Sequence, residues 1–199
     1  MSDDPVKKKK KKKLPGSYTE EGDFFGSVRD YLVLIAIALG IALLVVHFVA
    51  VRSVVDGNSM NPTLNNGDSL VVGRIQYVFS GPKRFDIVVF ELKDDPGTHY
   101  IKRIIGLPGE TVQIREGAVY INGELLSEDV YGNAKILRPG RAYEPLTLGE
   151  GEYFVLGDNR NNSQDSRYIA PGNIAKSQIV GKAFLRIWPF SSFGPLGEH

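Results

Sequence analysis

The sequence contains no cysteine. This absence excludes disulfides, thiol nucleophiles and thiolate metal sites, so the folded domain must be held together by ordinary packing. Histidine is also scarce, with three residues in a chain of 199. His47 lies inside the longest apolar run and His199 is the last residue. His99 is therefore the one candidate for a histidine base.

Net positive charge is also absent outside the amino-terminal lysine run. The net charge is +1, but seven lysines at residues 7–13 supply it, and the rest of the chain carries −6. A nucleic-acid partner is therefore not expected. The lysine run is flanked by Pro5, Pro15 and Gly16, repels itself and has nothing apolar to bury. We expect residues 1–30 to form a disordered, Lys-rich tail.

The longest apolar run covers residues 31–51 and contains no Asp, Glu, Lys or Arg. About 20 such residues are enough for a helix to span a bilayer. A cleaved secretory signal would have a shorter apolar region, of about 7 to 15 residues, ending in a small-x-small site. Phe48-Val49-Ala50 does not provide that site. The run is therefore interpreted as an uncleaved, single transmembrane anchor in the cell membrane.

The orientation of this anchor follows from its flanks. The lysine run and Arg29 precede it, and only Arg52 follows it closely. Basic residues are enriched on the cytoplasmic side of membrane spans. We expect the amino terminus in the cytoplasm and residues 52–199 on the extracytoplasmic side, next to a lipid bilayer.

Residues 52–199 contain no long stretch with apolar residues at helical spacing, so we expect one mostly β domain. Glu116-Gly117 and Asn122-Gly123 predict tight hairpin turns. Residues 127–150 have weaker patterning and include Pro139-Gly140, which indicates a surface excursion. The expected strands, rich in Val, Ile, Tyr and Phe, are residues 69–75, 86–92, 99–107, 111–115, 118–121, 153–156 and 178–188.

A serine follows the anchor in an unusual setting. Ser59 lies between Gly57 and Pro62, beside apolar residues on both sides. Most loop serines are turn residues or helix caps, so this position alone does not indicate catalysis. A serine nucleophile needs a base to take its proton. Ser59 can therefore act as a nucleophile only if another residue supplies that base.

The segment that begins at His99 offers a second candidate base, because Lys102 and Arg103 follow one another on an expected strand. Neighbours on a strand face opposite sides, so one of the two should point inward. The ordinary alternative is an edge strand on which both charges are solvated. Burial would disfavour the ammonium form and lower the pKa of Lys102. A neutral amine can then accept a serine proton.

The polar loop at residues 157–167 comes directly after an expected strand. Its spacing does not fit a calcium loop, because Arg160 and Ser163 stand where the motif needs an acidic or amide residue and a glycine. No metal is expected there. A structural network in which Asp158 and Asp165 pair with Arg160 and Arg167 is the simpler interpretation. A serine hydroxyl from this loop is a further candidate for orienting a base.

Three segments, in this order behind a single anchor, resemble boxes of the bacterial type I signal peptidases. They read SMNPTL at residues 59–64, YIKRIIGLPGE at 100–110 and GDNRNNSQDSR at 157–167. The resemblance extends from the anchor to Arg167. It implies a signal-peptidase-type, β-rich catalytic core that removes amino-terminal signal peptides from exported preproteins.

The resemblance also implies roles for particular residues. Ser59 would be the nucleophile and Lys102 the general base, and no cofactor would be needed. Ser163 would hydrogen-bond the lysine. The other supporting residues would be Asp158, Asp165 and Arg167. By the same analogy the substrate pockets, which accept small side chains at −1 and −3, would be lined by Val55, Met60, Leu64, Leu70, Tyr100 and Ile101.

This chain departs from the family pattern at two positions. Some members carry a serine where this chain has Gly57, so the oxyanion hole would rely on the backbone N–H of Ser59 and on another donor near Gly57. Phe85 stands where the family favours glycine, which makes the conformation of that turn an open question.

The sequence also allows two other interpretations. One is a non-catalytic, membrane-tethered β module whose 157–167 loop binds a partner. The other is a Ser/Lys peptidase that matures one dedicated substrate. The first predicts no effect from replacing Ser59 or Lys102, and the second predicts cleavage of a single precursor.

Overall fold

The computed structural model describes residues 21–132 and 134–196. Its contacts divide the chain into two compact units, Met1–Leu44 and Val45–His199. Helix α1 (Glu21–Val49) begins earlier than expected and ends earlier. Residues 21–30 are therefore helical and not disordered, and residues 50–51 belong to a strand. The rest of the predicted tail, residues 1–20, lies outside the described part.

The apolar side chains of α1 are exposed between Tyr31 and Leu43. Across residues 21–132 and 134–196, no helix meets the length and apolarity needed to cross a membrane.

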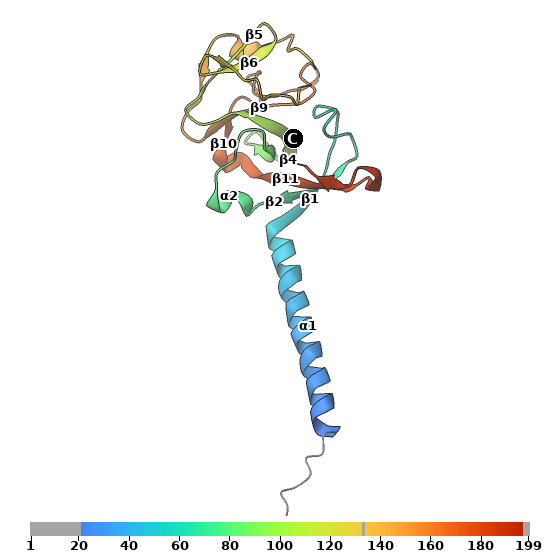
Figure 1. Ribbon diagram of the computed structural model, residues 1–199. Coiled ribbons are helices and arrows are strands. Elements are labelled where there is room, and N and C mark those ends of the chain that lie inside the picture. The colour runs from blue at the N-terminus through green and yellow to red at the C-terminus, as the bar shows by residue number, and fades with distance from the viewer. Residues whose placement is uncertain (1–20, 133, 197–199) are drawn as a thin grey trace, which may run out of the picture. The chain divides into compact units, whose positions relative to one another are not determined.

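The second unit is mostly β, as expected, and consists of antiparallel pairs (Figure 1). Its larger sheet has eight strands in the order β1-β2-β11-β3-β4-β9-β10, with β12 beside β11, and its smaller sheet has the order β7-β6-β5-β8. The elements are β1 (Ala50–Val54), β2 (Ser69–Gly73), α2 (Gln76–Phe79), β3 (Ile87–Leu92), β4 (Asp95–Gly106), β5 (Thr111–Arg115), β6 (Ala118–Ile121), β7 (Glu124–Leu125), η1 (Gly140–Tyr143), β8 (Leu146–Thr147), β9 (Glu152–Leu156), β10 (Ile174–Ala175), η2 (Lys176–Gln178), β11 (Ile179–Trp188), η3 (Phe190–Ser192) and β12 (Gly194–Pro195).

Each of the seven expected strands is present, with its ends shifted by a few residues at most. The two expected hairpins also form. Glu116 and Gly117 both have positive φ, 54° and 82°, as do Asn122 and Gly123, 52° and 86°. This geometry matches the right-handed twist of the flanking strands, which is why Asn-Gly and related pairs favour it.

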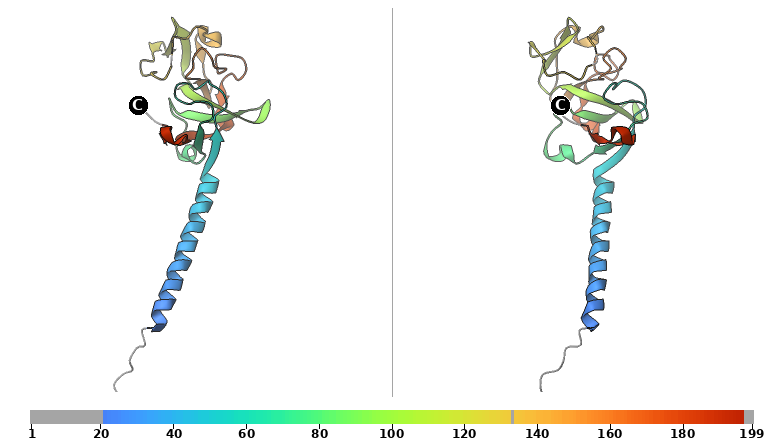
Figure 2. Two further views of the ribbon diagram at one scale, coloured as in Figure 1. Left: turned by 90° about the vertical axis from the view of Figure 1, so that its right-hand side faces the viewer. Right: turned by 45° about the vertical axis from the view of Figure 1, so that its right-hand side comes forward.

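The smaller sheet lies on one side of the larger sheet in both views of Figure 2. The hydrophobic core of the second unit has three clusters. One cluster joins the smaller sheet to β4 and β9. It includes Ile136, Ala142 and Leu148, which come from the expected excursion. The excursion is therefore partly a core element, and β8 within it pairs with β5.

Candidate active site

Ser59 lies in the turn between β1 and β2, and the 157–167 loop holds its main chain. The Asn159 N–H donates to the Ser59 carbonyl at 3.0 Å. The Asn159 side-chain amide donates to the Asn58 carbonyl at 3.1 Å. These bonds bring together two segments that are about one hundred residues apart in the sequence. Ser59 is thereby fixed while its side chain stays partly exposed.

Lys102 reaches Ser59 from β4. Its side chain is 5% exposed, and its Nζ donates to Ser59 Oγ at 2.8 Å and to the Ile101 carbonyl at 2.9 Å. Arg103, the next residue, is also buried, at 3%. The alternation of side chains predicted one inward residue, but both faces of β4 are covered at this point, so both are inside.

Burial lowers the pKa of Lys102 to about 8, although the carboxylates of Asp165 and Asp158 act in the opposite direction. An amine loses its proton as the pH rises through its pKa. Above about pH 8 most of the Lys102 amine is therefore neutral, and below this value the neutral fraction falls tenfold for each pH unit. The amine can accept the Ser59 proton in a pH range where an ordinary lysine stays charged.

Asp158 is completely buried and is held by charged and polar partners. Arg103 donates to both of its oxygens, from Nε at 2.9 Å and from Nη2 at 2.7 Å. The Thr63 hydroxyl donates to it at 2.6 Å. The expected pairing of Asp158 with Arg160 is therefore wrong. Asp158 joins the strand that carries Lys102 to the turn that carries Ser59.

Asp165 has the partner expected from the sequence. Arg167 donates to its two oxygens from Nε at 2.7 Å and from Nη2 at 2.8 Å. The Gly157 N–H donates to the same carboxylate at 3.1 Å. Asp165 therefore ties the two ends of the 157–167 loop together.

The partner of Arg160 is Asp129, which the sequence analysis did not single out. Nη1 and Nη2 of Arg160 donate to the two Asp129 oxygens at 2.6 and 2.7 Å. Both side chains are nearly buried, with 3% and 7% exposed. Asp129 precedes Arg160 by 31 positions and lies in the weakly patterned excursion, so spacing gave no reason to choose it.

Ser163 does not make the hydrogen bond expected for it. Within the described residues, its buried Oγ has no hydrogen-bond partner. Lys102 Nζ bonds Ser59 and Ile101 instead. A Cβ built on Gly157 would lie 2.2 Å from Ser163 Oγ and 2.4 Å from the Ser59 carbonyl oxygen. Gly157 thus lets the 157–167 loop and the Ser59 turn approach closely beside the serine.

A groove beside Ser59 is lined by residues from β1, the Ser59 turn, β3 and β4. Three of the six expected substrate-binding residues, Val55, Tyr100 and Ile101, line it. The other three, Met60, Leu64 and Leu70, are buried in the hydrophobic cluster that includes Val55. The groove residues that sequence analysis missed are Ser53, Val54, Asp56, Val89, Thr98 and His99.

His99 borders the groove but has another partner. Its Nε2 lies 2.8 Å from Glu91 Oε1, whereas the hydroxyl of Ser59 is bonded by Lys102. Of the two candidate bases, only Lys102 has a hydrogen bond to the serine in the described residues.

The two positions that depart from the family pattern adopt glycine-type backbone conformations. Gly57 has φ +91°, its N–H donates to Asn66 Oδ1 at 2.9 Å, and a Cβ placed there would meet nothing within 4 Å. Phe85 has φ 68°, a region that bulky residues rarely adopt. The ring centroids of Phe85 and Tyr131 lie 5.2 Å apart, and the Phe85 side chain packs against the core.

Comparisons with known proteins agree on one family. Residues 28–188 match the family model described as signal peptidase, peptidase S26. The probable signal peptidase I-1 of Synechocystis is 39% identical over 179 residues, which cover 86% of this chain and 88% of that protein. Signal peptidase I T of Bacillus subtilis is 39% identical over 164 residues, covering 79% and 83%. The crystal structure of a signal peptidase I from Enterococcus faecalis is 41% identical, with TM-score 0.43, and covers 52% of this chain and 97% of that one.

Proposed function

Because the chain belongs to the signal peptidase, peptidase S26 family, we propose that it cleaves amino-terminal signal peptides from exported preproteins with Ser59 as nucleophile and Lys102 as general base. The observation that carries this proposal is the 2.8 Å separation between Lys102 Nζ and Ser59 Oγ, with the amine buried. A proton acceptor must lie at hydrogen-bond distance from the hydroxyl it activates.

In the proposed mechanism, neutral Lys102 takes the Ser59 proton as Oγ bonds to the scissile carbonyl carbon. The negative charge moves to the carbonyl oxygen, which the Ser59 N–H and a second donor near Gly57 stabilise. Lys102 then gives its proton to the leaving amine as the peptide bond breaks. Water, activated by the same lysine, hydrolyses the acyl-enzyme and frees Ser59.

Asp158, Asp165 and Arg167 act as supporting residues in this mechanism. Their ion pairs, together with the hydrogen bond from the Thr63 hydroxyl to Asp158, hold β4, the Ser59 turn and the 157–167 loop together. Buried pairs of this kind fix geometry because breaking one leaves a charge without a partner inside the protein.

We assign the groove beside Ser59 to the substrate segment before the cleaved bond. An extended peptide beside a strand presents every second side chain to the same surface, so residues −1 and −3 face the enzyme together. Val55 and Ile101, which line the groove, contribute apolar surface to it. Small residues at both positions fit this arrangement.

The substrate assignment is tested with the full chain in detergent and two unrelated precursors that carry small-x-small sites. We expect both to be cut after the small residue at −1. Replacing that residue by leucine should reduce kcat/KM by about 10²-fold, because a methylene difference alone is worth about 10- to 200-fold in a fitted pocket. Mass spectrometry of the products gives the bond cleaved. Cleavage of a single precursor would favour a dedicated peptidase, and cleavage of neither would favour the non-catalytic module.

We propose further that the apolar part of α1, residues 31–49, anchors the protein in the cell membrane, with the amino terminus in the cytoplasm. The support is the charge-free apolar sequence of this segment and the exposure of its described side chains from Tyr31 to Leu43.

Membrane extraction tests the anchor. We expect the full chain to stay in the membrane pellet after an alkaline carbonate wash. Ala38→Lys with Ala42→Lys should release most of it, because each lysine near the centre of a span costs about 2.5 to 3.5 kcal/mol of insertion free energy. Ala38→Leu with Ala42→Leu is the matched control and should remain in the pellet. Release of the unchanged protein would contradict the anchor.

A further inference from the structure

The segment formed by residues 127–132 and 134–139, here called the strap, contacts the 157–167 loop at three places. Asp129 makes its two short bonds with Arg160. Asn161 bonds the strap main chain with both ends of its amide, donating to the Lys135 carbonyl and accepting from the Leu137 N–H, each at 2.9 Å. Arg167 donates to the Arg138 carbonyl at 3.3 Å.

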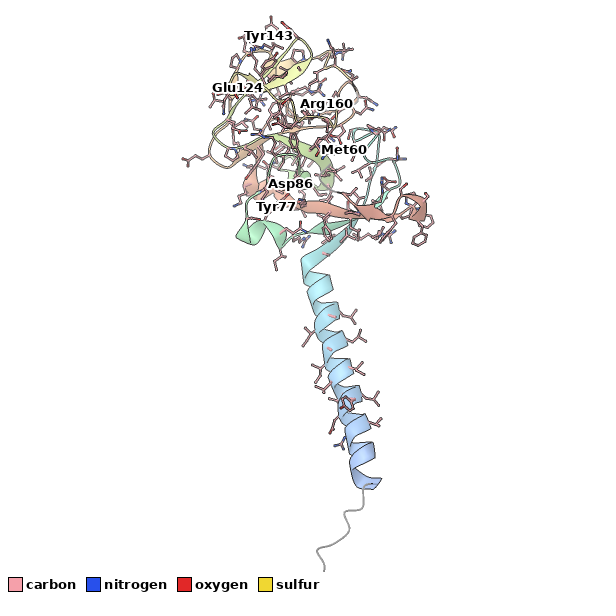
Figure 3. The ribbon with its side chains drawn as sticks, in the orientation of Figure 1. Met60, Tyr77, Asp86, Glu124, Tyr143 and Arg160 are labelled. Atoms are coloured by element: carbon pink, nitrogen blue, oxygen red, sulfur yellow. The ribbon has the colours of Figure 1, made fainter. Side chains whose placement is uncertain are left out.

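The first of these contacts leads directly to the reacting serine. Arg160, held by Asp129, donates from Nε to the Gly157 carbonyl at 3.1 Å. Gly157 lies against Ser59, because a Cβ at Gly157 would come within 2.4 Å of the Ser59 carbonyl oxygen. Figure 3 shows Arg160 between the turn with Met60 and the smaller sheet. Asp129, Arg160, Gly157 and Ser59 thus form a continuous series of contacts.

A second series of contacts leads from the strap to the lysine. The Tyr131 ring lies 3.7 Å from the guanidinium carbon of Arg103, and the Phe85 ring packs beside it. Arg103 is the neighbour of Lys102 on β4 and holds Asp158. The strap is therefore in contact with residues that position both members of the Ser59–Lys102 pair.

We propose that Asp129 is a positioning residue for catalysis, which acts through Arg160 to fix the Gly157 carbonyl and so the main chain that carries Ser59. The inference rests on the proposed Ser59–Lys102 mechanism and extends it to the strap. The competing explanation is that the pair only stabilises the fold. The two explanations differ because a positioning residue affects turnover even when stability is restored.

Asp129→Ala is the first test, with Glu128→Ala as the matched control on the exposed neighbouring carboxylate. We expect kcat to fall by about 10²-fold in Asp129→Ala, since a misplacement of about 1 Å has an effect of that size. KM should stay within twofold, because no groove residue changes. The rise of kcat/KM with pH should move to higher pH. A loosened loop admits water to Lys102 and to the carboxylates that face it, Asp158 and Asp165, and this weakens the effect of burial that lowers the pKa of Lys102. Glu128→Ala should match the unmodified protein.

A double variant separates positioning from stability. Asp129→Leu with Arg160→Leu removes both charges, so no buried guanidinium is left unpaired, and such replacements are often neutral or stabilising. We expect its thermal unfolding midpoint to be close to that of the unmodified protein while kcat remains about 10²-fold low, because the bond to the Gly157 carbonyl is lost. If Asp129→Ala fails to fold, the kcat of this double variant tests the proposal.

Either of two results would overturn the proposal: an Asp129→Ala protein whose kcat is within threefold of the unmodified one, or a double variant that recovers both stability and kcat. The proposed function is judged separately, by cleavage with the unmodified chain and loss of cleavage in Ser59→Ala. An active Asp129→Ala would therefore disprove the role of the strap and leave the dyad in place.

Discussion

Lys102→Met should lower cleavage of a small-x-small precursor by about 10²- to 10⁴-fold, because general bases contribute a factor of this size and the serine has no other proton acceptor bonded to it in the described residues. Methionine fits the buried site without a charge, so the thermal unfolding midpoint should change little. Ser59→Ala should show a loss at least as large. The measurement is kcat/KM on one precursor for all variants.

The pH dependence and a histidine control sharpen this test. In the unmodified protein, kcat/KM should rise about tenfold per pH unit and level off near pH 8, as burial lowers the pKa of Lys102 to about 8. Residual cleavage by Lys102→Met should lose that rise. His99→Ala should stay within a few-fold of the unmodified protein. If His99→Ala were inactive and Lys102→Met active, a histidine mechanism would replace the dyad.

Gly157→Ala should reduce kcat by about 10²-fold or more and destabilise the protein by about 1 to 3 kcal/mol. The added methyl group would lie 2.2 Å from Ser163 Oγ and 2.4 Å from the Ser59 carbonyl oxygen. One of these is a backbone atom that cannot rotate away, so the Ser59 turn and the 157–167 loop must separate. Steady-state kinetics and thermal unfolding report the two effects.

Gly194→Ala is the appropriate control for that substitution. A Cβ at Gly194 would meet nothing within 4 Å, and its φ lies outside the left-handed region. We expect normal turnover and a small change in stability from this variant. A Gly157→Ala protein with normal kcat would mean that the loop can move without disturbing Ser59, which contradicts the tight contact described above.

The strands of the second unit could be predicted because alternating β-branched and aromatic residues, and turns such as Asn122-Gly123, act locally. Strand β1 was missed because residues 50–51 are apolar and continue the run that precedes them. Composition alone does not show where such a run changes from helix to strand. Pairing with β2 decides it, and that contact is not local.

The site was predictable only in part. The proximity of Ser59 and Lys102 came from a family resemblance, since 43 positions separate them and no local pattern joins them. Asp129 could not be identified as the partner of Arg160, because many acidic residues were equally available in sequence. Met60, Leu64 and Leu70 were assigned to the groove, but an apolar residue can line a pocket or fill the core beneath it. Only the fold distinguishes these outcomes.

Three buried arginine–carboxylate pairs hold the site: Arg103 with Asp158, Arg167 with Asp165 and Arg160 with Asp129. These ion pairs form as the chain folds, and their formation involves no oxidation or reduction. Maturation of the site therefore requires neither an oxidant nor a disulfide isomerase. No disulfide can form or break in this cysteine-free domain when its surroundings change between reducing and oxidising.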